Sequence, residues 1–233
     1  MPQKVLTAKD MRGKGLFSKA YFASEEHNLS EGIDFFLTFT NAASTPIFIN
    51  KFKYSKGIAP KLYFLLSSPT HLFCSNKVRA VDDFNKSFFS DKLIDAKNSI
   101  LKDLKYFQWR YLTYNPNQYI ILELKSNDRI NGYAVLKKRT TKGLKFALLM
   151  DIIVNDSSQI GAIIKETRLW ASKNYFLGIM LLENELYNKT IKSYFKINTR
   201  KKFNFLVKGT EVHRQETLEN EKFNFFLGDL DFL

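Results

Sequence analysis

The sequence predicts an α/β protein with mixed central sheets flanked by helices, built as two modules of which the first is incomplete. Three observations support this prediction. Short apolar runs typical of strands alternate with segments of helical spacing. The order β-loop-α-β-α-β in residues 1–66 returns at the end of a β-β-β-α-β-α-β order in residues 106–233, which is a weak internal repeat of element order. Hydrophobic residues make up 45% of the 233 residues, enough for a packed core.

The first half is expected to contain three strands and two helices. A helix beginning at Leu16 should end just before Gly32, because glycine suits the position beyond a helix. The run Ile33–Phe39 is continuously apolar, which is typical of a buried parallel strand. Ser44 can cap a short helix that has Pro46 in its first turn. The other expected elements are the strands Lys4–Ala8 and Lys61–Leu66 and the helix Pro46–Phe52.

The second half is expected to follow a linker and a helical bridge. The best linker candidate is Ser67–Thr70, and Val81–Lys105 shows helical spacing of its apolar residues. The resulting domain prediction is a partial module at 1–68, a bridge at 69–105 and a second module at 106–233. Within that module, Phe107–Tyr111 is expected to open a β-rich set of elements. The expected strands are Tyr119–Leu124, Tyr133–Lys138, Phe146–Val154, Leu177–Leu182 and Lys202–Val207. The expected helices are Ser157–Ser172 and Glu185–Phe195.

The composition narrows the class of partner. The net charge of +13 suits nucleic acid, anionic lipid or a polyanionic small ligand. Lys and Arg are spread along the chain, which favours a solvated surface over a nucleic-acid-binding stripe. Cys74 is the single cysteine, and the sequence shows neither an apolar signal region nor a run of about 18–20 apolar residues. We therefore expect a cytoplasmic protein without a membrane span.

A basic glycine-rich loop is the strongest candidate for a binding site. It runs Arg12-Gly13-Lys14-Gly15-Leu16-Phe17 between an expected strand and an expected helix. Glycines let consecutive N–H groups point into one concavity, and a helix N-terminus adds unpaired N–H groups and a positive dipole. The loop matches neither a Walker loop nor a dinucleotide fingerprint. It predicts a pyrophosphate cradle of another kind, and an ordinary turn is the alternative.

The loop resembles the signature Arg/Gln-x-x-Gly-x-Gly/Ala of the GNAT-type N-acetyltransferase superfamily. Arg12 to Leu16 match its first five positions, and Phe17 stands where a small residue is usual. The segment Phe39-Thr40-Asn41-Ala42-Ala43-Ser44 resembles the Asn-x-x-Ser/Ala step of the same superfamily. The resemblance implies acetyl-CoA as co-substrate, with its pyrophosphate on residues 12–17 and with Asn41 and Ser44 near it.

Three departures from the superfamily bear on activity. Phe48 stands where members carry the tyrosine that protonates the leaving thiolate, and Lys53 replaces a family glycine. The first three strands of the fold are absent before Met1, so an upstream segment or another subunit is expected to complete the first sheet. The catalytic residues therefore stay unassigned. The alternative to an N-acetyltransferase is a non-catalytic acyl-CoA-binding or scaffold protein.

The second half resembles the second module of tandem GNAT-like proteins, which are often encoded beside bacterial cell-surface polysaccharide genes. The resemblance rests on residues 108–119, on Gly132–Leu136 and on the tail Phe225–Asp231. It implies an amine acceptor, such as an amino sugar or another cell-envelope precursor. The segment Asn155–Gly161 holds no Arg and no paired glycines, so we expect this module to be cofactor-free.

Several polar residues of the second half allow two interpretations each. Trp109 and Arg110 could line a pocket, or they could be an aromatic anchor beside a surface arginine. Asp151 and Asp156 could be paired carboxylates, although a turn at a strand end explains them better. Two carboxylates near the C-terminus, Asp229 and Asp231, could bind substrate hydroxyls or amines.

The sequence bears on a metal site, on nucleic-acid binding and on aminoacyl transfer as well. His27, His71 and His213 fall in unrelated segments without ligand partners at metal spacing, which argues against a metal site. A basic nucleic-acid-binding protein would show oligonucleotide binding that falls steeply with salt. Aminoacyl transfer to peptidoglycan precursors also uses tandem GNAT-like modules, but with charged tRNA, and the glycine-rich loop argues against it.

Overall fold

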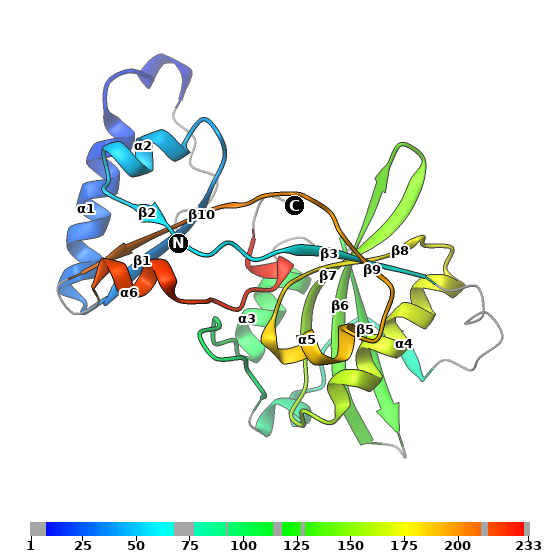
Figure 1. Ribbon diagram of the computed structural model, residues 1–233. Helices are drawn as coiled ribbons and strands as arrows, with labels where there is room; N and C mark the ends of the chain where they lie inside the picture. The colour runs from blue at the N-terminus through cyan, green and yellow to red at the C-terminus, as the bar shows by residue number, and fades with distance from the viewer. Residues whose placement is uncertain are drawn as a thin grey trace. The chain divides into compact units, whose positions relative to one another are not determined.

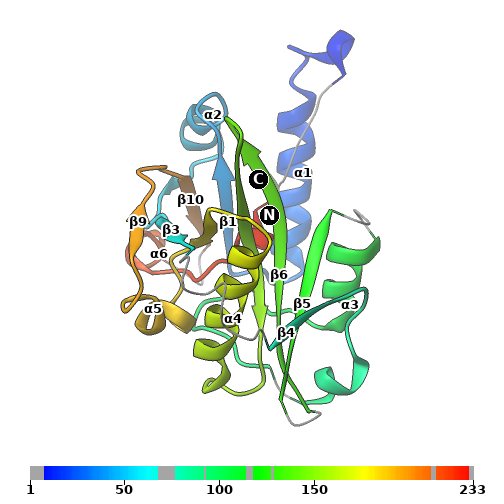
Figure 2. The ribbon, with the colours of Figure 1, turned by 90° about the vertical axis from the view of Figure 1, so that its right-hand side faces the viewer.

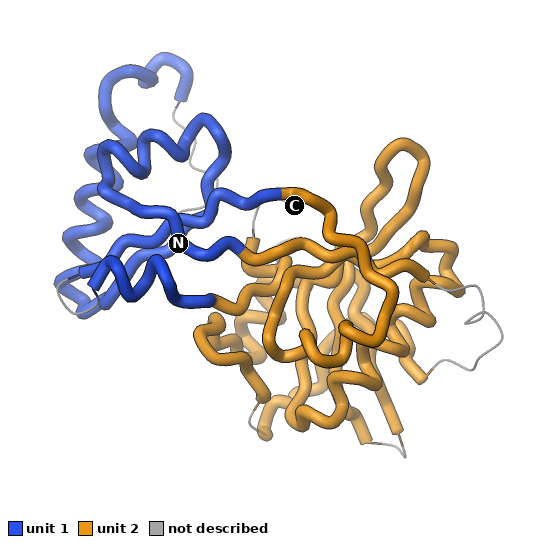
Figure 3. Tube along the Cα trace, in the orientation of Figure 1, with its two compact units in different colours: residues 1–59, 202–222, 231–233 blue, residues 60–201, 223–230 orange. Residues whose placement is uncertain are grey.

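The computed structural model describes residues 8–67, 77–91, 93–113, 118–126, 129–210 and 214–230. The chain forms two compact units (Figure 3). Unit 1 comprises residues 1–59, 202–222 and 231–233, and unit 2 comprises residues 60–201 and 223–230. The expected strand Lys4–Ala8 except its last residue, the expected linker Ser67–Thr70 except its first residue, and the residues His71, Cys74, His213 and Asp231 lie outside the described residues.

Unit 1 is a small α/β unit with a three-stranded sheet in the order β1-β10-β2 (Figure 1). Both strand pairs in this sheet are antiparallel. Its elements are the 3-10 turn η1 (Lys9–Met11), the helices α1 (Leu16–Ser30), α2 (Thr45–Asn50) and α6 (Gln215–Asn220), and the strands β1 (Phe35–Thr40), β2 (Ser55–Lys56) and β10 (Asn204–Gly209).

The end of α1 confirms the expected stop signal. Gly32 has φ +79°, a left-handed conformation that favours glycine, and its N–H donates to the Leu29 carbonyl at 3.0 Å. The Ile33 N–H donates to the Asn28 carbonyl at 3.1 Å, which satisfies another carbonyl of the last turn. The next strand differs from expectation, because β1 pairs antiparallel with β10 and most of its residues are only half-buried. Continuous apolar character did not distinguish a parallel strand from an antiparallel one here.

An aromatic cluster forms the core of unit 1. Tyr21 from α1 stacks on Phe52 with ring centroids 3.9 Å apart, and Phe48 from α2 lies 5.3 Å from both Phe52 and Tyr54. Leu206 of β10 completes the buried set. Burying large aromatic side chains stabilises a small unit strongly, and edge-to-face contacts add to that effect.

Unit 2 is built on a seven-stranded mixed sheet in the order β4-β5-β6-β7-β8-β3-β9. The pair β7–β8 is parallel and the other pairs are antiparallel. The expected order of strands and helices between residues 119 and 191 is confirmed. The strand expected at Lys202–Val207 lies instead in the sheet of unit 1, as β10. The strands are β3 (Leu62–Leu66), β4 (Val78–Val81), β5 (Tyr119–Ser126), β6 (Arg129–Thr141), β7 (Leu144–Ile153), β8 (Gly178–Leu182) and β9 (Lys196–Asn198).

Helices cover both faces of this sheet (Figure 2). On one face α4 packs on residues such as Leu122, Ala134 and Leu149 of the main core. On the other face Tyr133 contacts Phe84 at 5.3 Å between ring centroids, and Phe84 in turn contacts Phe107 of α3 at 5.8 Å. The helical elements of unit 2 are α3 (Leu104–Gln108), the π-helical turn η4 (Trp109–Thr113), α4 (Gln159–Lys173), α5 (Glu185–Ile191) and the 3-10 turns η3 (Lys86–Ser90) and η5 (Leu227–Asp229).

The two units share one local arrangement, and in each a strand from a distant part of the chain is inserted. In unit 1 the sequence β1-α2-β2 leaves a gap between its strands, and β10 fills it. In unit 2 the sequence β8-α5-β9 leaves the equivalent gap, and β3 fills it. The strands expected to end the two repeats, Lys61–Leu66 and Lys202–Val207, thus each lie in the sheet of the other unit, and the two-module organisation stays a prediction. The expected boundaries at 68 and 105 stay a prediction.

Two expectations about the middle of the chain were wrong. Val81–Lys105 is not a helix, because it contains the end of β4, the short turn η3 and irregular backbone. Its phenylalanines are spaced for contacts with Tyr133 and Phe107 rather than for one helix face. Phe107–Tyr111 is helical and not extended. No helix among the described residues is long and apolar enough to cross a membrane.

Candidate functional site

The loop before α1 has the backbone geometry expected of an anion cradle. Gly13 has φ +79° and Gly15 has φ +71°, and no side chain caps the N-terminus of the helix. The Lys19 N–H donates to the Gly15 carbonyl at 3.1 Å, so the N–H groups of the first turn before it have no acceptor within the helix. A Cβ atom on either glycine would meet nothing within 4 Å, so the space beside the loop is open. The loop therefore fits an anionic group at the positive end of a fifteen-residue helix.

Asn41 and Ser44 form a closed turn between β1 and α2. The Ser44 N–H donates to Asn41 Oδ1 at 2.9 Å, and the Asn41 N–H donates to Ser44 Oγ at 3.2 Å. Phe17, in the first turn of α1, lies 6.3 Å from Phe48 between ring centroids, so α1 and α2 begin at the same end of unit 1 (Figure 1). The structure thus brings the two predicted segments to one end of the unit. The side chains of Asn41 and Ser44, however, hydrogen-bond each other.

Two buried tyrosines lie beneath this end of unit 1. The hydroxyls of Tyr21 and Tyr54 are 2.9 Å apart, and Lys208 forms an ion pair with Glu25 beside them. Burial, together with the Glu25 charge, raises the pKa of Tyr54 to about 12 although the Tyr21 hydroxyl opposes the shift. Burial, with Tyr54 and Glu25, raises the pKa of Tyr21 above its usual range. Phe48 is 5% exposed and carries no transferable proton, so the departure seen in the sequence persists in the structure.

In unit 2 the two parallel strands stop pairing after two residue pairs, and we call the place between their carboxyl ends the crevice. β7 and β8 pair only at Ala147–Ile179 and Leu148–Met180. Beyond these pairs the register of β7 against β6 shifts, and Met150 is the extra residue of a β-bulge. The N-terminus of α4 lacks the glycines of the unit 1 loop, and Asp156 Oδ1 accepts a hydrogen bond from the Ser158 N–H at 2.8 Å. The turn expected at Asp156 is therefore confirmed.

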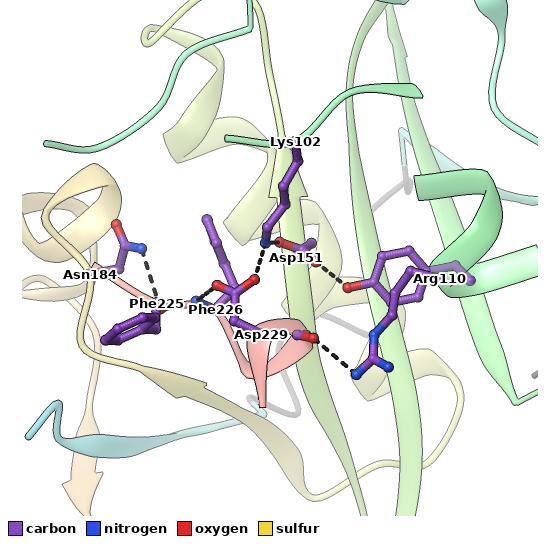
Figure 4. Close-up of polar contacts among 9 residues, drawn as sticks. Lys102, Arg110, Asp151, Asn184, Phe225, Phe226 and Asp229 are labelled. Atoms are coloured by element: carbon purple, nitrogen blue, oxygen red, sulfur yellow. Dashed lines mark hydrogen bonds and ion pairs between the residues drawn. The ribbon is translucent and has the colours of Figure 1, made fainter. Parts of the chain in front are cut away.

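The C-terminal segment of unit 2, residues 223–230, lies across this crevice (Figure 4). At one end the Asn184 side chain, just after β8, donates to the Phe225 carbonyl at 3.4 Å. At the other end Gly228 lies against β7, where a Cβ on the glycine would come within 3.0 Å of the Met150 carbonyl oxygen. The segment thus connects the carboxyl end of β8 to the bulge of β7.

Lys102 joins this segment to β7 through a buried ion-pair network (Figure 4). Its Nζ lies 2.5 Å from Asp151 Oδ1 and 2.7 Å from Asp229 Oδ1. The Tyr111 hydroxyl donates to the other oxygen of Asp151, and Arg110 donates to the Gly228 carbonyl at 3.0 Å. All of these groups are shielded from solvent, and two cations face two anions.

The pKa values of Lys102 and Asp151 are both raised in this network. Burial lowers the pKa of Lys102, but Asp151 and Asp229 raise it by more, so it lies above its usual range. Burial raises the pKa of Asp151 above its usual range, with Lys102 opposing and Asp229 adding to the shift. Removing any one member leaves an unbalanced charge in a low-dielectric interior.

Several interpretations of individual residues change with this geometry. Asp151 lies inside β7 and pairs with Lys102, so the turn expected there was wrong. Arg110 is not a surface arginine, because it is 6% exposed. Trp109 is 51% exposed and lies 6.0 Å from the Tyr106 ring. Lys102 and Tyr111 were missed, and the one available signal was a carboxylate within the otherwise apolar second half of β7.

A separate polar cavity of about 450 Å³ lies at the start of the loop after β7. Arg129 and Asp91 contribute opposite charges to its lining, and Asn155 Nδ2 donates to Asp91 Oδ2 at 3.2 Å. The remaining lining residues are Asn85, Ser87, Phe88 and Ile130. Among the described residues, no group of three or more His, Cys, Asp or Glu side chains is arranged to hold a metal ion.

Comparison with solved structures identifies the fold. A GCN5-related N-acetyltransferase from Anabaena variabilis matches with a TM-score of 0.60 at 9% identity, over 87% of this chain and 53% of that one. A GCN5-related N-acetyltransferase from Kribbella flavida matches with a TM-score of 0.57 at 11% identity, over 88% and 50%. A protein from Enterococcus faecalis described as a probable N-acyltransferase matches with a TM-score of 0.56 at 8% identity, over 88% and 52%.

The chain therefore has the fold of the GCN5-related N-acetyltransferases, and it spans about half the length of these three structures. No protein-family model matches the sequence, and the search of curated proteins finds no match.

Proposed function

We propose that this chain is an acyltransferase, or part of one, that takes an acetyl group from acetyl-CoA through the loop at residues 12–17 of unit 1. The observation that carries the proposal is the pair of left-handed glycines, Gly13 and Gly15, directly before α1 in a chain with this fold. Left-handed residues that alternate with others can turn successive N–H groups into one concavity, which is how backbone anion sites are built.

The loop would act by binding and orienting the co-substrate. Backbone N–H groups of the first turn of α1 would hold the pyrophosphate, and Arg12 and Lys14 would supply charge at the rim. Asn41 and Ser44 lie at the same end of the unit and would flank the ligand. Direct transfer further needs an amine held against the thioester carbonyl and a base that removes its proton, and these groups stay unassigned.

The remaining features of the proposal concern the acceptor and the rest of the assembly. The acceptor would be a small-molecule or glycan-precursor amine, such as an amino sugar or a cell-envelope precursor, as the resemblance of the second half implies. Among the described residues β1 pairs on one side only, with β10. A segment or subunit that adds a strand to the other side of β1 would complete the first sheet of a two-module arrangement.

A second candidate is a protein that binds acyl-CoA without transferring the acyl group. One observation favours it. Phe48 is buried among Phe17, Tyr21, Phe52 and Tyr54, and neither tyrosine in this set is exposed enough to reach a ligand. A leaving thiolate at the loop would therefore have no tyrosine proton available from this cluster.

Calorimetric titration with acetyl-CoA tests the proposal. Micromolar binding is expected for the wild type, and an Arg12→Ala, Gly15→Glu variant should lose it, because a carboxylate would enter the cradle. Gly32→Glu is the matched control, since Gly32 also has positive φ and open space but lies at the other end of α1. Absence of binding by the folded wild type would overturn the proposal. Binding without turnover of any amine in a panel would select the second candidate.

A further inference from the structure

The crevice between β7 and β8 is where a ligand site is expected in unit 2. In open α/β sheets, ligands bind beyond the carboxyl ends of parallel strands, at the point where neighbouring strands diverge. β7 and β8 are the only parallel pair in the described sheet, and they separate after two residue pairs. Asn184, which follows β8, is completely buried, so something covers this place.

The cover is the chain's own segment 223–230, which is buried along its whole length. Phe226 packs on Tyr187 with ring centroids 6.1 Å apart and belongs to the main core. Asn224 anchors the start of the segment, because its side chain accepts from the Glu185 N–H at 2.9 Å and donates to the Lys97 carbonyl at 2.6 Å. The segment is therefore recognised by backbone hydrogen bonds and by pockets for aromatic rings, as a bound peptide is.

The far end of the segment is fixed by shape and by charge. Gly228 is packed against Tyr111, Asp151 and the Met150 carbonyl so closely that no Cβ could be added. Asp229 makes two contacts at once, with Lys102 at 2.7 Å and with the Phe226 N–H at 2.8 Å. In the part of the chain that the structure describes, the loop at residues 12–15 of unit 1 is exposed.

We infer that the crevice of unit 2 is a peptide-binding site occupied permanently by residues 223–230, which stand in the place of a separate ligand. Lys102 holds the segment by neutralising a carboxylate on the segment and a carboxylate on β7. Unit 2 then has no room for acyl-CoA. This last consequence rests on the proposed function, in which the co-substrate binds at unit 1.

Hydrogen–deuterium exchange on the full chain tests this inference. In the wild type, amides of residues 223–230 should exchange as slowly as those of β6. Lys102→Met and Asp229→Asn should each accelerate exchange of the segment at least tenfold, because each leaves a buried charge unbalanced. Asp229→Asn keeps an oxygen that can accept the hydrogen bond from the Phe226 N–H. If Lys102→Met does not fold, the result for Asp229→Asn decides the test. Lys105→Met, an exposed lysine nearby, should leave exchange unchanged.

The outcomes separate this inference from the proposed function. Fast exchange of the segment in the wild type, or unchanged exchange in Asp229→Asn, would overturn the inference. So would faster exchange of the segment on adding acetyl-CoA, since that would make it a removable lid. Acetyl-CoA that protects no residue of 12–17 would instead count against the proposed function and leave the peptide site intact.

Discussion

The ammonium of Lys102 lies 2.7 Å from a carboxylate oxygen of Asp229, and the side chains of both residues are at most 5% exposed. Lys102 belongs to an irregular segment before α3, whereas Asp229 lies in the turn near the end of the described chain. Their contact, shared with Asp151, ties the C-terminal segment into unit 2. The packing of this segment therefore depends on buried ion pairs that no local sequence pattern predicts.

Replacing the lysine should destabilise the protein strongly. Lys102→Met leaves two buried carboxylates without the cation that pairs with both, and breaking a buried pair in this way costs about 3–5 kcal/mol. Urea denaturation should show this loss in the free energy of unfolding. Lys105→Met should change it by no more than about 0.5 kcal/mol, as is usual for exposed sites. Equal effects of the two variants would contradict the ion-pair network.

Two glycine substitutions should have opposite effects on stability. Gly228→Ala would force a methyl group into Tyr111 and the Asp151 carboxylate, so it should destabilise by about 1–3 kcal/mol or more. Gly161→Ala, in α4, meets only a Thr190 methyl at 4.0 Å, and alanine favours a helix by about 0.5–1 kcal/mol. Thermal unfolding should show a lower melting temperature for Gly228→Ala and a higher one for Gly161→Ala. A neutral Gly228→Ala would show that the tail is not packed as described.

Stability should fall at alkaline pH through the buried tyrosines of unit 1. The pKa of Tyr54 is raised from 10.0 to about 12 in the folded protein, chiefly by burial. Because the folded pKa is the higher one, the stabilising contribution is complete below the unfolded pKa of 10.0 and is lost as the pH rises toward 12. Tyr54→Phe should flatten the decline in the free energy of unfolding across this window. Tyr175→Phe, at an 86% exposed position, should not.

Local patterns predicted most elements of the fold but not their pairing. The four strands from β5 to β8 and the helix α4 follow from apolar periodicity, because each is set by its own side chains. The insertion of β3 beside β8 and of β10 beside β1 depends on contacts between residues far apart in the chain, which a single sequence does not reveal. The misassigned helix at 81–105 has the same cause, since its phenylalanines pack on Tyr133.

In the candidate sites, too, features set by one residue could be predicted from the sequence, and contacts between distant residues could not. The conformation of the glycines at 13 and 15 was predictable because glycine adopts positive φ more readily than any other residue. The ion pairs of Lys102 were not, because its two partners are separated from it by whole elements of structure. Asp151 gave a partial signal, as a carboxylate within β7, but its partner could be found only in three dimensions.

Glycine-selective ¹⁵N NMR tests the central claim most directly. The protein has ten glycines, so the spectrum is simple, and single Gly→Ala variants assign the peaks. On titration with acetyl-CoA, we predict that the amide resonances of Gly13 and Gly15 shift, while those of Gly161 and Gly228 in unit 2 stay in place. Shifts confined to Gly161 and Gly228, or no shift at any glycine, would contradict an acyl-CoA site on unit 1.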